Sequence, residues 1–223
     1  MAVQTEFLAT VPYFAGLDSA ELDSVKKVIF EKMAVRGEVI LFEGEPATEL
    51  YFVTSSVVKV FKTSADGKEQ ILQLIRPGES FNDVPVFSGG MNLASAAAMG
   101  SVVLYGLSKS DLEVILHSIP KVARNLIQVL SQRVQQMLLL VEDLSFRNVI
   151  GRVAKLLLEY AADGSGERPR LTQQEMAAIA GTAREMVGRS LKVLEEEGAI
   201  RLYNHRIVVT DNQALQRRMG TVW

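Results

Sequence analysis

The chain of 223 residues contains no cysteine and only two histidines. Without thiols it can form no disulfide, no cysteine-ligated iron–sulfur cluster and no thiol switch. No stretch reaches the roughly 18 uninterrupted apolar residues of a membrane-spanning helix, and residues 1–16 lack both the basic start and the apolar run of a signal peptide. We therefore expect a cytoplasmic protein with no membrane partner.

Catalytic constellations are also missing from the sequence. It has no cysteine nucleophile, no cluster of histidine with carboxylates and no GxxxxGK[ST] phosphate-binding loop. An enzyme is therefore the class that the sequence supports least. Because 48% of the residues are hydrophobic, the chain can bury a substantial core, and a globular protein is expected.

The net charge of −2 hides an asymmetry along the chain. Residues 1–145 carry 12 Lys and Arg against 17 Asp and Glu, a net charge of −5. Residues 146–223 carry 12 against 9, a net charge of +3. An excess of this size is weak support for a polyanionic partner of the C-terminal part.

The N-terminal half reads as a lead helix followed by short strands. SAELDSVKKVI, residues 19–29, predicts the helix. Residues 32–108 are rich in Val, Ile, Phe and Tyr, and turn signals interrupt them about every 8–12 residues. ELYFVTSSVVKVFK and KEQILQLIRPGE are predicted as neighbouring strands joined around Asp66-Gly67. The pattern predicts a small barrel or sandwich.

A long helix is predicted from Pro120 to about residue 146, because proline is accepted in the first turn of a helix. Its apolar positions recur at steps of 3 and 4, the spacing of a coiled-coil seam. They are Ile127, Leu130, Val134, Met137, Val141 and Leu144. We favour a two-stranded coiled coil with a second copy of the chain, since neighbouring leucines widen the apolar surface. An amphipathic helix that packs on its own domain is the alternative.

The C-terminal part reads as three helices and a hairpin. NVIGRVAKLLLEYAA, residues 148–162, predicts a helix that ends at a polar loop over residues 163–166. Two further helices follow within residues 171–200. GAIRLYNHRIVVT then predicts two short strands around residues 204–205. This is the pattern of a winged helix-turn-helix.

Residues 171–200 contain two helix-start signals close together. Thr172 is followed three residues later by Glu175, and Thr182 by Glu185, so each threonine can cap a helix as part of a capping box. Gly181 fits the turn between the helices, since glycine adopts a positive φ at little cost. Two helices joined in this way cross steeply, and the second can enter a DNA major groove while the first braces against the backbone.

Charged residues occupy the first two turns of the second helix. Arginine offers guanine a bidentate fork, and glutamate accepts a hydrogen bond from the cytosine amino group. Arg184, Glu185 and Arg189 are therefore candidate base contacts. The alternative is an ordinary solvated face with an internal Glu–Arg pair.

The order of lead helix, strand-rich segment, long helix and winged helix-turn-helix resembles the CRP/FNR family of bacterial transcription regulators, the catabolite activator class. The RExxGR-like core at residues 184–189 is similar to the recognition helix of its cyclic-AMP receptors. PGESF at residues 77–81 and the spacing of Gly37 and Gly44 support the resemblance. It implies an α+β fold with a β-roll sensor domain over residues 1–108, a long dimerisation helix over 109–146 and a winged helix-turn-helix DNA-binding domain over 147–223.

By this resemblance, Arg184 and Arg189 would read guanines and Glu185 a cytosine, in TGTGA-like half-sites of double-stranded DNA. Contacts to phosphates would come from Thr172, Gln174 and Thr182. Ala183 departs from the family, in which a serine commonly contacts a phosphate. The resemblance further implies a homodimer that reads a palindrome and acts with RNA polymerase.

The resemblance also implies an effector pocket in the β-roll, and the sequence departs from the family there. Nucleotide-binding members hold the cyclic phosphate with a loop of the form FGEL…RSA, whereas the aligned stretch here is FNDVPVFSGGMNLAS. Asn82 stands for the glycine, Asp83 for the glutamate, Asn92 for the arginine and Leu93 for the serine. The remaining expected pocket residues are Gly78, Glu79 and, in place of a polar pair that meets adenine, Met137 and Leu138. Because the phosphate loses its counter-charge, we expect an effector other than cyclic AMP.

Haem is an alternative effector, since some relatives use it to sense nitric oxide or carbon monoxide. His205 fits the hairpin tip, and His117 fits a packing or surface position better than an axial ligand. Two further alternatives stay open. One is a constitutive regulator whose β-roll is only a dimer scaffold, and the other is a cyclic-nucleotide-binding module without DNA binding.

Overall fold

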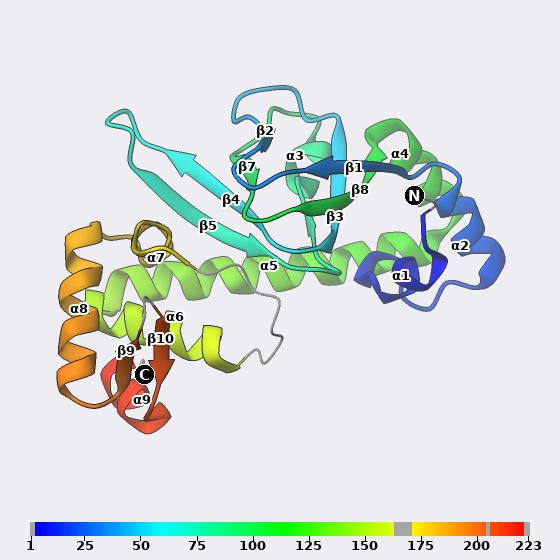
Figure 1. Ribbon diagram of the computed structural model, residues 1–223. Coiled ribbons are helices and arrows are strands. Elements are labelled where there is room, and N and C mark those ends of the chain that lie inside the picture. The colour runs from blue at the N-terminus through cyan, green and yellow to red at the C-terminus, as the bar shows by residue number, and fades with distance from the viewer. Residues whose placement is uncertain (1–2, 163–170, 204–205, 221–223) are drawn as a thin grey trace. The chain divides into compact units, whose positions relative to one another are not determined.

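The computed structural model describes residues 3–162, 171–203 and 206–220 (Figure 1). The chain divides into two compact units, Met1–Lys62 with Leu72–Gln135, and Thr63–Ile71 with Gln136–Trp223. The first contains most of the strands and the N-terminal helices, and the second contains the C-terminal helices and a hairpin. The mixture of helices and strands confirms the predicted α+β class.

Two four-stranded sheets form the framework of the first unit. Their strand orders are β1-β8-β3-β6 and β2-β7-β4-β5. The bounds are β1 Phe30–Ala34, β2 Val39–Leu41, β3 Glu49–Ser55, β4 Val58–Thr63, β5 Glu69–Ile75, β6 Ser80–Phe81, β7 Ser95–Ala98 and β8 Val102–Ser108. Buried side chains from both sheets, including Val53, Val58 and Leu104, form one apolar cluster. The sheets therefore face each other across a shared core.

The expected strand over ELYFVTSSVVKVFK is wrong in one respect. The structure divides it into β3 and β4, which belong to different sheets. Ser56, which lies between them, has a φ of 62°, a left-handed conformation that turns the chain. The predicted pairing around Asp66-Gly67 is confirmed, because β4 and β5 are neighbours in one sheet.

Helices flank the sheets of the first unit. They are α1 Thr5–Thr10, the 3-10 helix η1 Pro12–Phe14, α2 Ser19–Lys26, α3 Asp83–Ser88, α4 Lys109–Ser118 and the first part of α5 Pro120–Phe146. The predicted lead helix is α2, which begins with a capping box between Asp18 and Glu21. Residues 109–146 hold two helices, because Ile119 adopts φ −129° and ψ 80° before Pro120. A residue that precedes proline is disfavoured in the helical region.

The second unit forms around its own apolar core. Its elements are the end of α5, α6 Val149–Ala162, α7 Gln173–Ala180, α8 Arg184–Glu196, β9 Ile200–Tyr203, β10 Arg206–Val209 and α9 Asn212–Met219. Val153, Val187, Leu194 and Leu215 are fully buried in the core. The antiparallel strands β9 and β10 form the predicted hairpin. The expected loop at 163–166 and the hairpin tip at 204–205 lie outside the described residues.

One of the two predicted capping boxes is confirmed. The Thr172 hydroxyl accepts from the Glu175 amide at 3.1 Å, and the Glu175 carboxylate accepts from the Thr172 amide at 2.6 Å. The second is wrong, because the residue that precedes α8 is Ala183, which offers no side-chain cap. The Thr182 amide donates to the Ala177 carbonyl at 3.0 Å, so Thr182 belongs to the turn. Gly181 has a φ of 61°, as expected for that turn.

Candidate nucleic-acid interface

The buried face of α8 determines which of its side chains point to solvent. Val187, Ser190, Leu191 and Leu194 are buried against the core of the second unit. Because side chains three and four residues apart share a face of a helix, the positions between them face outward. The helix-turn-helix therefore presents one polar face along the first two turns of α8.

Glu185 and Arg189 lie on this exposed face of α8, and Arg184, the first residue of the helix, is exposed as well. Within the part of the chain that the structure describes, none of their side chains forms a hydrogen bond or an ion pair. The internal Glu185–Arg189 pair of the alternative interpretation is therefore not formed. By contrast, Lys192 on the same helix lies 3.9 Å from Glu196. The three side chains can engage a ligand without first breaking an internal contact.

The expected phosphate contacts flank this face. Thr172 and Gln174 are exposed at the start of α7, and Thr182 is half-buried in the turn. The Thr172 hydroxyl accepts a hydrogen bond as the cap of α7, and its O–H group can still donate. Because Ala183 provides no side-chain cap, the first backbone N–H groups of α8 are left for an external acceptor.

The predicted seam of α5 is an exposed apolar stripe. Ile127, Val134, Met137, Val141 and Leu144 expose between 42% and 65% of their surface, and Leu130 is half-buried. Leu138 and Leu139 extend the apolar surface beyond the seam. If α5 packed only on its own domain, its apolar stripe would be buried against that domain. The exposure of these side chains therefore argues against that alternative.

Two asparagines hold together the loop that the sequence aligns with a phosphate cassette. Asn82, in a left-handed conformation with a φ of 68°, donates from its side-chain amide to the Glu49 carbonyl at 3.0 Å and to the Asn92 Oδ1 at 2.9 Å. The Asn92 amide donates to the Phe42 carbonyl at 3.0 Å, and Asn92 is buried. These amides bond to one another and to the backbone, and they supply no positive charge.

Asp83 is the most buried charged residue of this region, with 1% of its surface exposed. Its Oδ2 accepts from the Tyr13 hydroxyl at 2.6 Å, and its Oδ1 accepts from Arg133 Nη1 at 2.7 Å. The Arg133 guanidinium also donates to the carbonyl and hydroxyl oxygens of Ser80. Burial is the main cause that raises the pKa of Tyr13 well above its ordinary value, with the Asp83 charge adding to it. Tyr13 therefore stays a hydrogen-bond donor near neutral pH.

The other expected pocket residues are distributed over both units. Gly78 and Glu79 form the turn before β6, where the Glu79 carboxylate accepts from the Arg76 amide at 2.7 Å. Leu93 follows Asn92 and is 58% exposed. Met137 and Leu138 are exposed on the part of α5 that belongs to the second unit. The structure brings Asn82 and Asn92 together, and it joins Asp83 to Arg133, a residue that the expected pocket did not include.

Two family models match the chain. A cyclic nucleotide-binding domain covers residues 31–118, and a Crp-like helix-turn-helix domain covers residues 151–218. The chain belongs to the CRP/FNR family of transcription regulators. The resemblance recognised in the sequence is thus confirmed, and the family regulates transcription rather than catalysing a reaction.

Relatives match along most of the chain. The cyclic AMP receptor protein of Thermus thermophilus is 35% identical, over 86% of this chain and 88% of its own length. A CRP-like cAMP-activated global transcriptional regulator of Mycobacterium tuberculosis is 30% identical, over 96% and 98%. The solved structure of FixK2 from Bradyrhizobium japonicum covers 88% of this chain and 100% of its own, with a TM-score of 0.78 and 24% identity, and so supports the fold.

Of the two histidines considered as haem ligands, the structure describes His117. His117 lies exposed on α4, with its Nδ1 2.8 Å from the Glu113 carbonyl oxygen, which does not fit a buried axial ligand of haem. His205 lies outside the described residues. No helix in the described ranges has the length and apolar character needed to cross a bilayer.

Sequence reasoning missed a polar junction where α5 meets α6. Asp143 pairs there with Arg147 and Lys155, and Arg152 binds backbone carbonyls beside them. The spacing of Asp143 and Arg147, four residues apart, was the available local signal. The Lys155–Asp143 pair and the bond from Arg152 to Ala180 had no such signal, because both depend on how α6 packs against α5 and α7.

Proposed function

We propose that the chain is a homodimeric, sequence-specific DNA-binding regulator that reads a palindrome of TGTGA-like half-sites and acts with RNA polymerase. The observation that carries this proposal is the set of unpaired, exposed side chains of Arg184, Glu185 and Arg189 on the first turns of α8. Residues 1–108 would sense an effector, residues 109–146 would dimerise and residues 147–223 would bind DNA. The cytoplasm is the expected location.

The mechanism of reading follows from the chemistry of this face. With α8 in the major groove, the arginine forks would donate to guanine O6 and N7, and Glu185 would accept from a cytosine amino group. Thr172, Gln174 and Thr182 would hold phosphates on either side. These phosphate contacts fix the register without reading the sequence, so that discrimination depends on the three charged residues.

The homodimer is supported by the uncovered seam of α5. A second copy would bury the exposed apolar side chains of both helices, and dimers read two half-sites about one helical turn apart. Dimerisation would therefore convert two weak half-site contacts into one specific contact.

Met137→Glu tests the seam. It places two like charges together in the coiled coil, so we expect the dimer dissociation constant to rise at least about tenfold and operator binding to weaken with it. Sedimentation measures the first and fluorescence anisotropy the second. Gln132→Glu, which adds the same charge at an exposed position outside the seam, is the control. A Met137→Glu protein that stays dimeric would place the interface elsewhere.

The effector of this chain is proposed to be different from cyclic AMP, although relatives are named for that nucleotide. The side-chain amides of Asn82 and Asn92 already bond within the protein, and Asp83 already accepts from Tyr13 and Arg133. A bound phosphate would have to compete with these bonds. An apolar or planar effector, or none, fits this arrangement better than an anion.

Calorimetry tests this part of the proposal. We expect no saturable heat of binding from millimolar cyclic AMP, because the loop offers the phosphate no free cation. Leu93→Arg places a guanidinium at an exposed position of the loop and should create measurable affinity. Asn92→Arg is a poorer choice, since Asn92 is buried and holds the loop. Micromolar binding by the unmodified protein would overturn the proposal.

A further inference from the structure

One arginine connects three segments at the junction between the long helix and the helix-turn-helix. Arg152, in the first turn of α6, donates from Nη1 to the Arg147 carbonyl at 2.6 Å, just after α5 ends. Its Nε donates to the Ala180 carbonyl at 2.7 Å, and its Nη2 lies 3.4 Å from the Gly181 carbonyl oxygen. These carbonyls belong to the ends of α5 and α7, where helices leave oxygens without internal partners.

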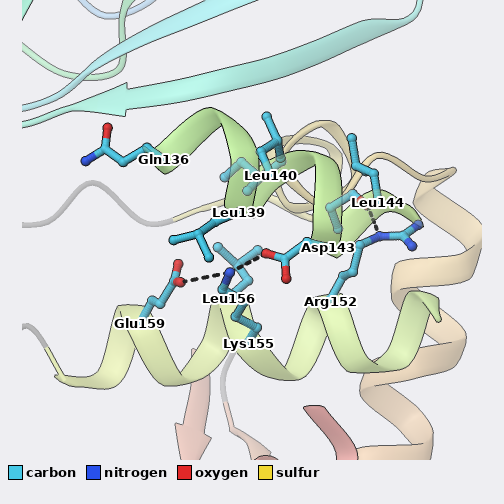
Figure 2. Close-up of a pocket in the computed structure, with 11 residues that line it drawn as sticks. Gln136, Leu139, Leu140, Asp143, Leu144, Arg152, Lys155, Leu156 and Glu159 are labelled. Carbon is cyan, nitrogen blue, oxygen red and sulfur yellow. Dashed lines mark hydrogen bonds and ion pairs between the residues drawn. The ribbon is translucent and has the colours of Figure 1, made fainter. Parts of the chain in front are cut away.

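A second set of polar contacts supports the same junction. Asp143, in the last turn of α5, accepts a hydrogen bond from Arg147 Nε at 2.5 Å. It also pairs with Lys155 of α6 (Figure 2). Arg147 also donates to the Met219 carbonyl at 2.6 Å, at the end of α9. The side chains of Asp143 and Arg147 are largely buried, at 14% and 11% exposure. The end of α5 is therefore bonded to α6 through Asp143 and Lys155, to α9 through Arg147, and to α7 through Arg152.

Apolar packing contributes less on this side of α5. A pocket of about 250 Å³ lies between α5, α6 and α7 (Figure 2). Leu139 and Leu144, which line it, are 54% and 42% exposed. Because some of the side chains around this space are partly exposed, we infer that hydrogen bonds and ion pairs contribute to holding the angle between the end of α5 and the helix-turn-helix.

We propose that Arg152 is a positioning residue for operator recognition, which sets the distance between half-sites that the dimer accepts. It joins the last turns of α5, which carry Met137, Val141 and Leu144 of the seam, to the helix that precedes α8. A planar guanidinium with several donors fixes direction as well as distance. This inference rests on the proposed function, because it requires the seam and the palindrome.

The test measures how strictly the full-length protein selects half-site spacing. Fluorescence anisotropy gives the affinity for palindromes whose two TGTGA half-sites stand at the preferred spacing, one base pair closer, or one base pair further apart. In Arg152→Met, which keeps the apolar stem, affinity at the preferred spacing should fall about tenfold, the effect of losing hydrogen bonds to a charged group. Affinities at the other spacings should fall by less than about threefold, so that the selectivity flattens.

A matched control separates the effect of losing the contacts of Arg152 from the effect of losing one positive charge. Arg217→Gln removes one exposed arginine of α9, which lies 3.7 Å from the Asp211 carboxylate. It should keep the wild-type selectivity. Arg152→Lys keeps the charge but can bond fewer carbonyls, so it should lie between wild type and Arg152→Met, and it serves as the test if the methionine variant does not fold.

Two results would overturn the role of Arg152. One is an equal loss of affinity at every spacing, which would indicate a general loss of charge or folding. The other is an unchanged preference in both Arg152 variants, with sedimentation showing an intact dimer. If the wild-type protein itself does not distinguish the palindrome from scrambled DNA, the proposed function fails, and this is visible before any variant is measured.

Discussion

Arg133→Met is expected to lower the free energy of unfolding by about 3–5 kcal/mol, the cost of leaving a buried charge without its partner. Asp83 Oδ2 would keep its hydrogen bond from the Tyr13 hydroxyl, whereas Oδ1 would lose its bond from the Arg133 guanidinium. With 1% of its surface exposed, Asp83 has almost no access to water that could replace the lost contact. Urea or thermal unfolding followed by circular dichroism measures the change.

The double variant Asp83→Asn with Arg133→Met is the control for this expectation. It removes both charges, so its loss of stability should be clearly smaller than that of Arg133→Met alone. Arg124→Met, at an exposed position of the same helix, should change stability by less than about 0.5 kcal/mol. A loss of less than about 1 kcal/mol in Arg133→Met would contradict the proposed importance of the pair.

Arg184→Ala and Arg189→Ala should each weaken binding to the specific site by roughly 1–3 kcal/mol, about ten- to hundredfold. Each change removes one of the proposed bidentate donors to guanine. Affinity for random DNA should change much less, since phosphate contacts provide most of non-specific binding. Anisotropy titrations on the palindrome and on scrambled DNA at one salt concentration measure both.

Lys192→Ala is the matched control on the same helix, because Lys192 is exposed and close to Glu196. It removes an equal charge beyond the first two turns of α8, so it should affect specific and random DNA alike. The assignment of Arg184 and Arg189 would be wrong if their variants lost the same affinity on both DNAs.

Local patterns were sufficient to predict much of the fold. The steps of 3 and 4 predicted α5, and the capping box at Thr172 and Glu175 predicted the start of α7. The same signal failed at Thr182, because a capping-box pattern does not reveal which residue leaves the helical conformation. The start at Ala183 depends on the geometry of the turn. No prediction was made for α9, although Asp211 caps it with bonds to Gln213 and Ala214.

The long-range contacts of the candidate sites could not be predicted in this way. Asp83 and Arg133 are 50 residues apart in the sequence, and Arg152 reaches Ala180 across 28 residues. Neither contact follows from helix or strand periodicity, because both contacts depend on how the elements pack. The outward orientation of Glu185 and Arg189 was predictable, because they are four residues apart and each lies two positions before a buried residue, Val187 or Leu191, on the opposite side of the helix. Arg184 is exposed because it is the first residue of α8.

The most direct test of DNA reading is a competition between two duplexes of equal length and composition, one with a TGTGA palindrome and one with the same bases scrambled. It is measured at fixed salt for the full-length protein as purified, with and without cyclic AMP. We expect the palindrome to bind at least about 10³-fold more tightly than the scrambled duplex, with no change on adding the nucleotide. Equal binding of the two duplexes in both conditions would contradict it.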